Sequence, residues 1–173
     1  MEGNQKICYF LGANTASGFY SLYDELPSSA GFVWFIKGGP GNGKSTFMRS
    51  VAAAAENAGH VVEYFLCSGD PDSLDGILIP DLDVAYVDAT SPHVQEPGLP
   101  GAGGRYIDLS TFYKHDAVFD VERISDCFTR YRARYSNAYD CFRAAALISR
   151  ACAPVSLTQA VQRSRIFSGA PLI

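Results

Sequence analysis

The chain has 173 residues, of which 47% are hydrophobic and 18% charged, so it can form one folded domain with a core and is not intrinsically disordered. The formal net charge of −4 hides an imbalance, because residues 1–104 carry 12 acidic and 4 basic side chains whereas residues 105–173 carry 6 and 10. Neither half has the basic excess of a dedicated nucleic-acid binder, so we do not expect nucleic acid as a partner.

Cysteine usage and hydrophobicity bear on the compartment. The five cysteines are scattered and form no CxxC pair, and the three histidines lack metal-ligand spacing, which favours free thiols in a reducing cytosol. The opening residues MEGNQKICYF do not resemble a secretory signal, and no apolar run reaches the roughly 18 residues of a membrane helix. We therefore expect a cytoplasmic protein with no membrane partner.

Short apolar runs of strand length recur through the first 110 residues, separated by turn residues. Residues 44–59 differ, because they are rich in alanine and end on Gly59, which predicts a helix. Residues 19–26 fit a strand or a short helix, and residues 68–76 a polar loop. The expected strands are residues 7–13, 32–38, 61–67, 77–79, 84–88 and 105–109.

From about residue 118 the apolar positions recur every three or four residues, which predicts a long amphipathic helix over 118–151. Its apolar seam is aromatic or small, whereas a coiled coil favours aliphatic residues. We expect the seam to pack against the sheet or a partner helix, with most arginines solvated and one or two within reach of a phosphate. The seam residues are Val121, Ile124, Phe128, Tyr131, Tyr135, Ala138, Phe142 and Ala145.

The segment GGPGNGKST contains the pattern G-x-x-x-x-G-K-S, after an expected strand and at the start of an expected helix. In that context backbone N–H groups wrap a phosphate and the helix N-terminus adds its dipole. Lys44 is expected to reach the β- and γ-phosphates, Ser45 to offer a hydroxyl to Mg²⁺ and Thr46 to touch the α-phosphate. The candidate nucleotide-binding residues are Gly38, Gly39, Pro40, Gly41, Asn42, Gly43, Lys44, Ser45 and Thr46.

The segment VAYVD is an apolar strand that ends in the carboxylate of Asp88. Carboxyl ends of parallel strands meet at one edge of a sheet, so Asp88 is the expected magnesium partner of Ser45. Asp83 is a weaker candidate, because it starts the same strand at the opposite edge. The strand order and this loop together predict an α/β fold, a three-layer P-loop NTPase-type domain with a mainly parallel sheet, followed by the long helix.

The group that would activate water is left open. Many ATP-hydrolysing enzymes have a glutamate directly after the magnesium carboxylate, and here that residue is Ala89. His93 is the third candidate catalytic residue beside Lys44 and Asp88, because it lies five residues beyond Asp88 and can orient water. The loop carboxylates Asp70, Asp72 and Asp75 are alternatives, and a cap or surface role fits each of these side chains as well.

Several segments together resemble a family of uncharacterised bacterial P-loop ATPase-like proteins, chiefly SGDPDSLDG and DATSPH, with FLGANTASGFYSLYDEL and IKGGPGNGKST. The similarity covers most of residues 8–110 and is looser in the long helix. The resemblance implies ATP binding through Gly38–Thr46 with Asp88 as the magnesium carboxylate, and it implies no particular substrate. Members of that family hold two P-loop units in tandem, and this chain resembles the N-terminal unit.

The end of the chain offers a hint of a second unit. YFLGAN at residues 9–14 and IFSGAP at residues 166–171 share F-x-G-A, and each would be a short strand. We therefore expect residues 1–160 to form the nucleotide-binding domain and residues 161–173 to be a tail that begins a second, truncated unit.

Three functions fit these features. The first is a Mg·ATP-binding NTPase with slow hydrolysis coupled to a conformational change, with ATP and Mg²⁺ as cofactors. The second is a small-molecule kinase that holds its acceptor at the acidic loop 70–75. The third is a non-catalytic, nucleotide-gated module whose long helix engages a second P-loop unit or another copy of the chain. ATP and GTP are not distinguished, although no N-K-x-D guanine motif occurs.

Overall fold

The computed structural model describes residues 6–23, 30–90, 94–98, 101–113 and 120–168, with the backbone alone from 153 to 168. The chain divides into two compact units, Met1–Ala13 with Phe19–Phe119 and Asn14–Gly18 with Asp120–Ile173. The boundary falls just before the long helix, whereas the sequence pattern placed that helix and the sheet in one domain ending at residue 160.

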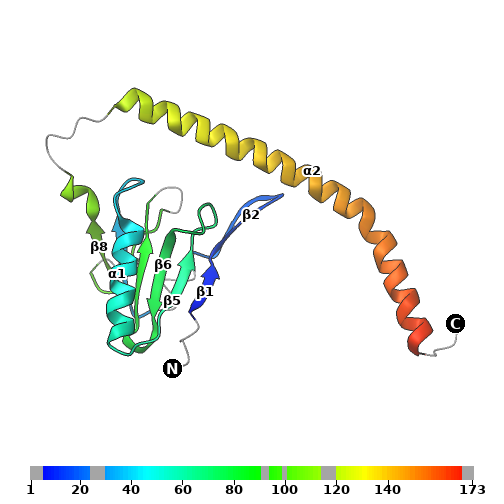
Figure 1. Ribbon diagram of the computed structural model, residues 1–173, viewed down its shortest axis with the longest axis horizontal. Helices are drawn as coiled ribbons and strands as arrows, with labels where there is room; N and C mark the ends of the chain where they lie inside the picture. Colours follow the sequence, from blue (N-terminus) through cyan, green and yellow to red (C-terminus); the bar gives the residue numbers. More distant parts are fainter. Residues whose placement is uncertain (1–5, 24–29, 91–93, 99–100, 114–119, 169–173) are drawn as a thin grey trace. The chain divides into compact units, whose positions relative to one another are not determined.

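The first unit is built on a six-stranded sheet in the order β1-β5-β6-β7-β4-β8 (Figure 1). Five of these strands run in one direction, and β6 alone is antiparallel to both of its neighbours. The α/β class with a mainly parallel sheet is therefore confirmed. The strands are β1 (Ile7–Phe10), β4 (Phe32–Lys37), β5 (Glu63–Leu66), β6 (Leu74–Ile79), β7 (Val84–Asp88) and β8 (Gly104–Asp108).

Strand β6 departs from the sequence prediction. Residues 77–79 were expected as a small strand after a polar loop, yet β6 already begins at Leu74, and all six of its residues are buried. Asp75 and Gly76 interrupt the apolar run that would have marked a central strand, because both residue types are depleted in strands. The turn η2 (Pro80–Leu82) then reverses the chain into β7.

Helix α1 (Lys44–Asn57) follows β4 and agrees with the predicted helix 44–59 to within two residues. Its buried residues are Met48, Ala52 and Ala55, spaced by four and three so that they share one face. The helix ends where Gly59 takes a positive φ of 91°, a conformation that a glycine adopts without steric cost.

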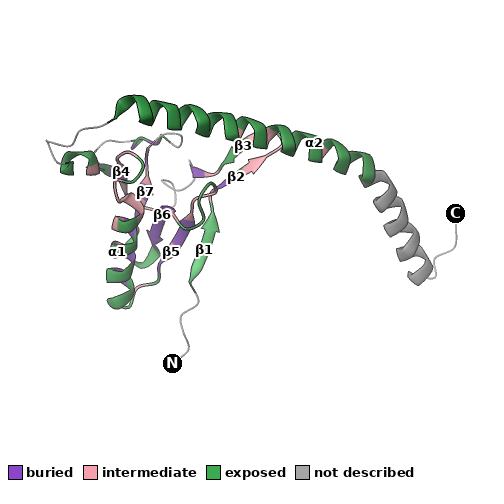
Figure 2. Ribbon diagram, turned by 45° about the horizontal axis from the view of Figure 1, so that its top comes forward, coloured by how far each residue is buried: buried purple, intermediate pink, exposed green. Residues whose placement is uncertain are grey.

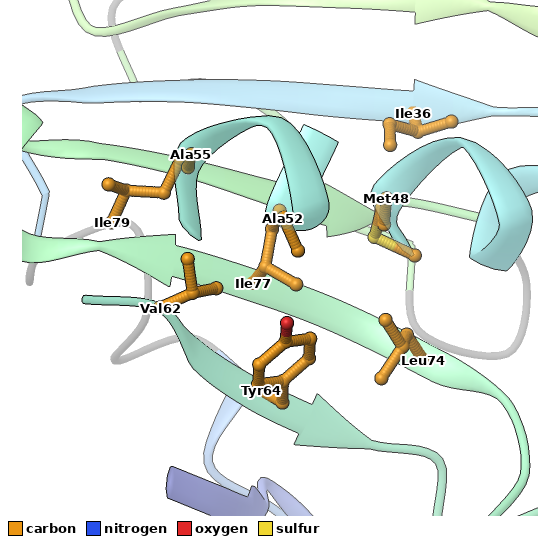
Figure 3. Close-up of a cluster of buried hydrophobic side chains, with 9 residues drawn as sticks. All are labelled: Ile36, Met48, Ala52, Ala55, Val62, Tyr64, Leu74, Ile77 and Ile79. Atoms are coloured by element: carbon orange, nitrogen blue, oxygen red, sulfur yellow. The ribbon is translucent and has the colours of Figure 1, made fainter. Parts of the chain in front are cut away.

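Apolar side chains form a cluster on each face of the sheet. The first cluster lies between α1 and the sheet (Figure 3). The second lies on the opposite face. Along β4, Ile36 belongs to the first cluster and Phe35 to the second, as the alternation of side chains in a strand requires. The first cluster comprises Ile36, Met48, Ala52, Ala55, Val62, Tyr64, Leu74, Ile77 and Ile79.

A three-layer domain needs helices on both faces of the sheet. Among the described residues of the first unit, α1 is the only α-helix, accompanied by the short turns η2 and η3 (Leu109–Phe112). The structure shows a mixed sheet with one α-helix packed on it, and a helical layer on the other face stays a prediction.

The second unit consists of the helix α2 (Val121–Ser168) and the tip of a hairpin formed by β2 (Gly12–Thr15) and β3 (Gly18–Ser21). The hydroxyl of Tyr139 donates a hydrogen bond of 2.8 Å to Oδ1 of Asn14. The helix is longer than the predicted 118–151 and includes residues 166–168, so the short strand predicted there is wrong for those residues; 169–173 lie outside the described residues. The prediction stopped before Pro154, whose missing N–H normally ends a helix, but this helix continues past that residue.

The aromatic seam of α2 is largely exposed, with Phe128 45% and Tyr131 54% accessible (Figure 2). Successive rings contact one another along the helix, with centroids 4.6 Å apart for Tyr131 and Tyr135 and 6.4 Å for Tyr135 and Tyr139. Packing of this seam against the sheet or a partner helix stays a prediction. None of the helices in the described parts of the chain combines the length and hydrophobicity needed to span a bilayer.

Candidate functional site

The candidate site lies at the edge of the sheet where β4 and β7 end. These strands are parallel neighbours, and Ile36 is in register with Asp88. The glycine-rich loop, residues 38–43, leaves β4 at this edge and leads directly into α1 (Figure 1). The prediction that this loop and Asp88 share one edge is confirmed, and Asp83 lies at the opposite end of β7, where its Oδ1 accepts a 2.7 Å hydrogen bond from the N–H of Gly31.

Two glycines give the loop its shape. Gly38 has a φ of 154°, and a Cβ placed there would lie 3.2 Å from the side-chain nitrogen of Asn42. Gly43 has a φ of 82° and caps α1 in the left-handed conformation, directly before Lys44. Because L-residues avoid this region, the glycines at these positions have a steric cause that is independent of any ligand.

Lys44 connects the loop to the neighbouring strand. Its Nζ donates hydrogen bonds to the carbonyl oxygens of Gly38 at 2.7 Å and Gly39 at 3.0 Å. The same Nζ lies 3.5 Å from Oδ2 of Asp88, and the lysine side chain is only 11% exposed. A lysine ammonium has three protons to donate, so the loop carbonyls and the carboxylate together satisfy it.

The Asp88 carboxylate is oriented by a hydrogen bond from the segment that follows it. Its Oδ1 accepts a 2.9 Å hydrogen bond from the N–H of Thr90. The hydroxyl of Thr90 donates to the carbonyl oxygen of Gly38 at 3.1 Å, which ties the end of β7 to the loop. Burial raises the pKa of the Asp88 carboxyl, while the charge of Lys44 and the bonds from Thr90 act in the opposite direction. The sequence reasoning missed Thr90, although an aspartate often accepts a hydrogen bond from the backbone N–H two residues further on.

Ser45 links α1 to strand β6. Its Oγ accepts a 3.0 Å hydrogen bond from the N–H of Leu74, the first residue of that strand. A serine hydroxyl keeps a second lone pair and its own proton, so this bond leaves Ser45 able to meet a metal ion or a phosphate.

Asn42 completes the loop. Its Oδ1 accepts a hydrogen bond from the hydroxyl of Tyr113, just beyond η3. Its Nδ2 is buried and has no hydrogen-bond partner among the described residues. A buried amide donor without an acceptor costs free energy, so this loop presents a donor that a phosphate oxygen can satisfy.

The candidates for water activation are dispersed. Ala89 is 1% exposed in the second cluster, so the residue after Asp88 is on the opposite face of the sheet. Asp70 is exposed and accepts a 2.8 Å hydrogen bond from the hydroxyl of Ser73, and Asp72 is also exposed. Asp75 is buried in β6. His93 lies outside the described residues.

The last residue of β4 is another lysine, Lys37, which lies on the opposite face of the sheet from Lys44. Nζ of Lys37 donates to the carbonyl oxygen of Ala89 at 2.9 Å and lies 3.1 Å from Oε1 of Glu96. Since Ile36 belongs to the first cluster, alternation assigns Lys37 to the face of the second cluster. This pair is a useful internal comparison for the pair formed by Lys44 and Asp88.

The donor set at the loop fits magnesium and not a metal cage. The described residues contain no group of three or more His, Cys, Asp or Glu side chains arranged to hold a metal ion. Mg²⁺ is usually held by one or two protein oxygens together with phosphate oxygens and water. A hydroxyl on Ser45 and a carboxylate on Asp88, at one edge of the sheet, satisfy that requirement.

No family model, curated protein or solved structure matches the chain. Membership of the tandem P-loop family therefore stays a prediction, and the function is inferred from the geometry of the site alone.

Proposed function

We propose that the chain is a P-loop nucleotide-binding protein that binds Mg·ATP at residues 38–46 and hydrolyses it slowly. The observation that carries the proposal is the position of Lys44. Its ammonium lies between the carbonyls of the glycine-rich loop and the carboxylate at the end of the adjacent parallel strand. A cation at that point is what the phosphates of a nucleotide require.

Each group of the loop would bind a different part of Mg·ATP. The backbone N–H groups of Gly41, Gly43 and Lys44 and the N-terminus of α1 offer donors and a positive dipole end to the β-phosphate. Lys44 neutralises the β- and γ-phosphates, and the unpartnered Nδ2 of Asn42 supplies a further donor. Ser45 and Asp88 would hold the magnesium ion, which neutralises charge on the phosphate oxygens when bound.

Slow turnover follows from the surroundings of Asp88. Ala89 is buried on the far face of the sheet, so the position used for water activation in the glutamate-bearing ATPases supplies no base here. His93 stays the candidate for orienting water. The hydrolysis that we propose therefore depends on positioning and charge neutralisation more than on a strong adjacent base.

A conformational change is expected on binding. Lys44 must exchange its bonds to Gly38 and Gly39 for bonds to phosphate, and Thr90 ties the same Gly38 carbonyl to the end of β7. Binding therefore rearranges contacts between the loop and the strand, and it couples the nucleotide to the sheet.

Phosphate release tests the proposal. Wild type with Mg²⁺ should release phosphate from ATP above background, and Lys44→Ala should reduce the rate to background because the phosphates lose their cation. GTP is assayed in parallel to decide the nucleobase. Tight ATP binding without any release would favour the nucleotide-gated module, and no binding of either nucleotide would overturn the proposal.

A small-molecule kinase is the second candidate, and the alanine at position 89 favours it because a kinase needs no water-activating glutamate. It would transfer the γ-phosphate to a hydroxyl acceptor held near loop 70–75, where Asp70 and Asp72 are exposed. Release of ADP that rises when hydroxyl compounds are added, without matching free phosphate, would identify this activity.

A further inference from the structure

Asp75 occupies a special position in the sheet. Strands β6 and β7 are antiparallel, with Gly76 in register with Val87 and Ile77 with Tyr86. One further step in the same register brings Asp75 opposite Asp88. On its other side, the pairing of β5 with β6 shifts from Phe65↔Gly76 to Leu66↔Leu74, so Asp75 is the extra residue of a β-bulge. Bulges redirect side chains and are frequent beside functional sites.

The backbone at this bulge touches the candidate magnesium site directly. The N–H of Leu74, the residue before Asp75, donates a 3.0 Å hydrogen bond to Oγ of Ser45. Asp75 therefore lies one residue from a contact with the expected magnesium hydroxyl and across the strand from the expected magnesium carboxylate.

The Asp75 carboxylate is buried and oriented. It is 6% exposed, and its Oδ2 accepts a hydrogen bond from the hydroxyl of Tyr23, which is itself 2% exposed. Burial, followed by this hydrogen bond, raises the pKa of Tyr23, so the phenol stays a donor to the carboxylate at any physiological pH. Tyr23 thus holds one oxygen of Asp75, and the thiol of Cys67 also hydrogen-bonds to this carboxylate. A carboxylate has about four acceptor sites, so Asp75 can still accept a hydrogen bond from a water molecule.

Two carboxylates side by side in a sheet are unfavourable without a counter-charge. The negative charge of Asp75 adds to the causes that raise the pKa of Asp88, so the two groups interact across the strands. Lys44 lies 3.5 Å from Asp88 and supplies one positive charge to the pair. A divalent cation supplies the charge that remains to be balanced, because carboxylate oxygens and water are its preferred ligands.

We propose that Asp75 is the second carboxylate of the magnesium site, where it accepts a hydrogen bond from a water bound to the ion and is oriented by Tyr23. This inference rests on the proposed function, since the ion enters with the nucleotide. Asp75 is a positioning residue in this account, acting on the ion through water and not on the phosphate. Groups in this position in other metal sites change metal affinity about 10- to 100-fold when they are removed.

The magnesium requirement of nucleotide binding tests the inference. A fluorescent ATP analogue is titrated into Asp75→Asn at a series of Mg²⁺ concentrations, and again in EDTA. Asparagine keeps an acceptor for Tyr23 but loses the charge, so the Mg²⁺ concentration for half-maximal binding should rise about 10-fold or more. Binding in EDTA should be unchanged or tighter, because a negative charge near the phosphates is removed. Asp81→Asn, an exposed residue of η2 at the other end of β6, is the matched control and should leave both values unchanged.

Tyr23→Phe decides the question independently if Asp75→Asn does not fold. Loss of the phenol hydroxyl should raise the Mg²⁺ requirement in the same direction by a smaller factor. If wild type binds the analogue with Mg²⁺ and the folded variants share its Mg²⁺ requirement, Asp75 has a purely structural role and the inference is wrong while the proposed function stands. If wild type binds no analogue at any Mg²⁺ concentration, the proposed function fails and the inference fails with it.

Discussion

Two lysines near the carboxyl end of β4, Lys37 in the strand and Lys44 at the start of α1, form ion pairs on opposite faces of the same sheet. The two pairs have similar lengths and differ in their surroundings. Lys37 lies 3.1 Å from Glu96, and the two side chains are 29% and 63% exposed. Lys44 lies 3.5 Å from Asp88, and these side chains are 11% and 20% exposed. We refer to the two pairs with their immediate contacts as the Lys37 side and the Lys44 side.

The shorter ion pair, Lys37 with Glu96, gives less indication of a functional site. An exposed ion pair is screened by water and contributes little, whatever its length. On the Lys44 side the pair is largely removed from water and joins a loop in which Gly38, Gly41 and Gly43 have positive φ angles and the Asn42 Nδ2 is unpartnered. Burial of the ion pair and the backbone conformation of the loop therefore distinguish the candidate site from an ordinary surface pair, and distance does not.

The largest expected effect on stability tests how firmly the Lys44 side is joined to the sheet. Ser45→Ala removes the acceptor for the N–H of Leu74, a residue 2% exposed, and should lower the free energy of unfolding by about 1–3 kcal/mol. Ser50→Ala is the matched control, because the Ser50 hydroxyl only donates to the exposed carbonyl of Thr46 one turn earlier in α1. Urea denaturation measures the free energy of unfolding of both variants. Equal, small decreases in the two variants would mean that the Ser45 hydroxyl contributes no more to stability than an exposed serine hydroxyl.

The pH dependence of stability provides a second, intermediate effect. Burial raises the pKa of Asp88 above the ordinary value of 3.8, so its contribution to stability is lost as the pH rises through the raised pKa. Hydrogen bonds from Ser110 lower the pKa of Asp108, so its contribution is present above 3.8 and is lost as the pH falls through the lowered pKa.

Asp88→Asn and Asp108→Asn should therefore change stability with opposite slopes. Relative to wild type, the unfolding free energy of Asp88→Asn should increase as the pH rises from about 3.8, and that of Asp108→Asn should decrease as the pH rises towards about 3.8. Urea denaturation from about pH 3 to about pH 7 measures both. A flat profile for Asp88→Asn would mean that the Asp88 carboxyl is solvated like a surface group, and the contrast between the two sides would be lost.

The smallest effect is expected on the Lys37 side. A double-mutant cycle with Lys37→Ala and Glu96→Ala should give a coupling energy of about 0–1 kcal/mol, because Glu96 is mostly exposed. A cycle is needed because Lys37 also donates to the carbonyl of Ala89. A coupling above about 2 kcal/mol would place this pair among buried, specific interactions and would remove the basis for treating it as a control.

Most of the fold could be predicted because its strands are continuous apolar runs and α1 has alanine, a face of buried residues and a glycine stop. Strand β6 was shortened in the prediction because Asp75 and Gly76 look like loop residues, and only the sheet on both sides of them makes a strand there. The extent of α2 was missed because Pro154 signals an end that the longer helix overrides.

The candidate site also contains some residues that the sequence predicted and others that it did not. Lys44, Ser45 and Asp88 follow from a local pattern and from the rule that parallel strands end at one edge. The contact of Thr90 with Gly38 and the contact of Tyr23 with Asp75 each join residues 52 positions apart. Such pairs depend on strand register and on the bulge, which no local pattern specifies, so the sequence could supply Asp75 only as one of three loop carboxylates.

Nucleotide affinity tests the central claim most directly. A fluorescent ATP analogue with Mg²⁺ is titrated into wild type, Lys44→Ala and Lys37→Ala, two variants that each remove one positive charge, on opposite faces of the sheet. Loss of charge-assisted bonds from Lys44 to phosphate should weaken binding roughly 10- to 100-fold, whereas Lys37→Ala should bind within about twofold of wild type. Equal affinities for all three proteins, or equal losses in both variants, would contradict a phosphate site at residues 38–46.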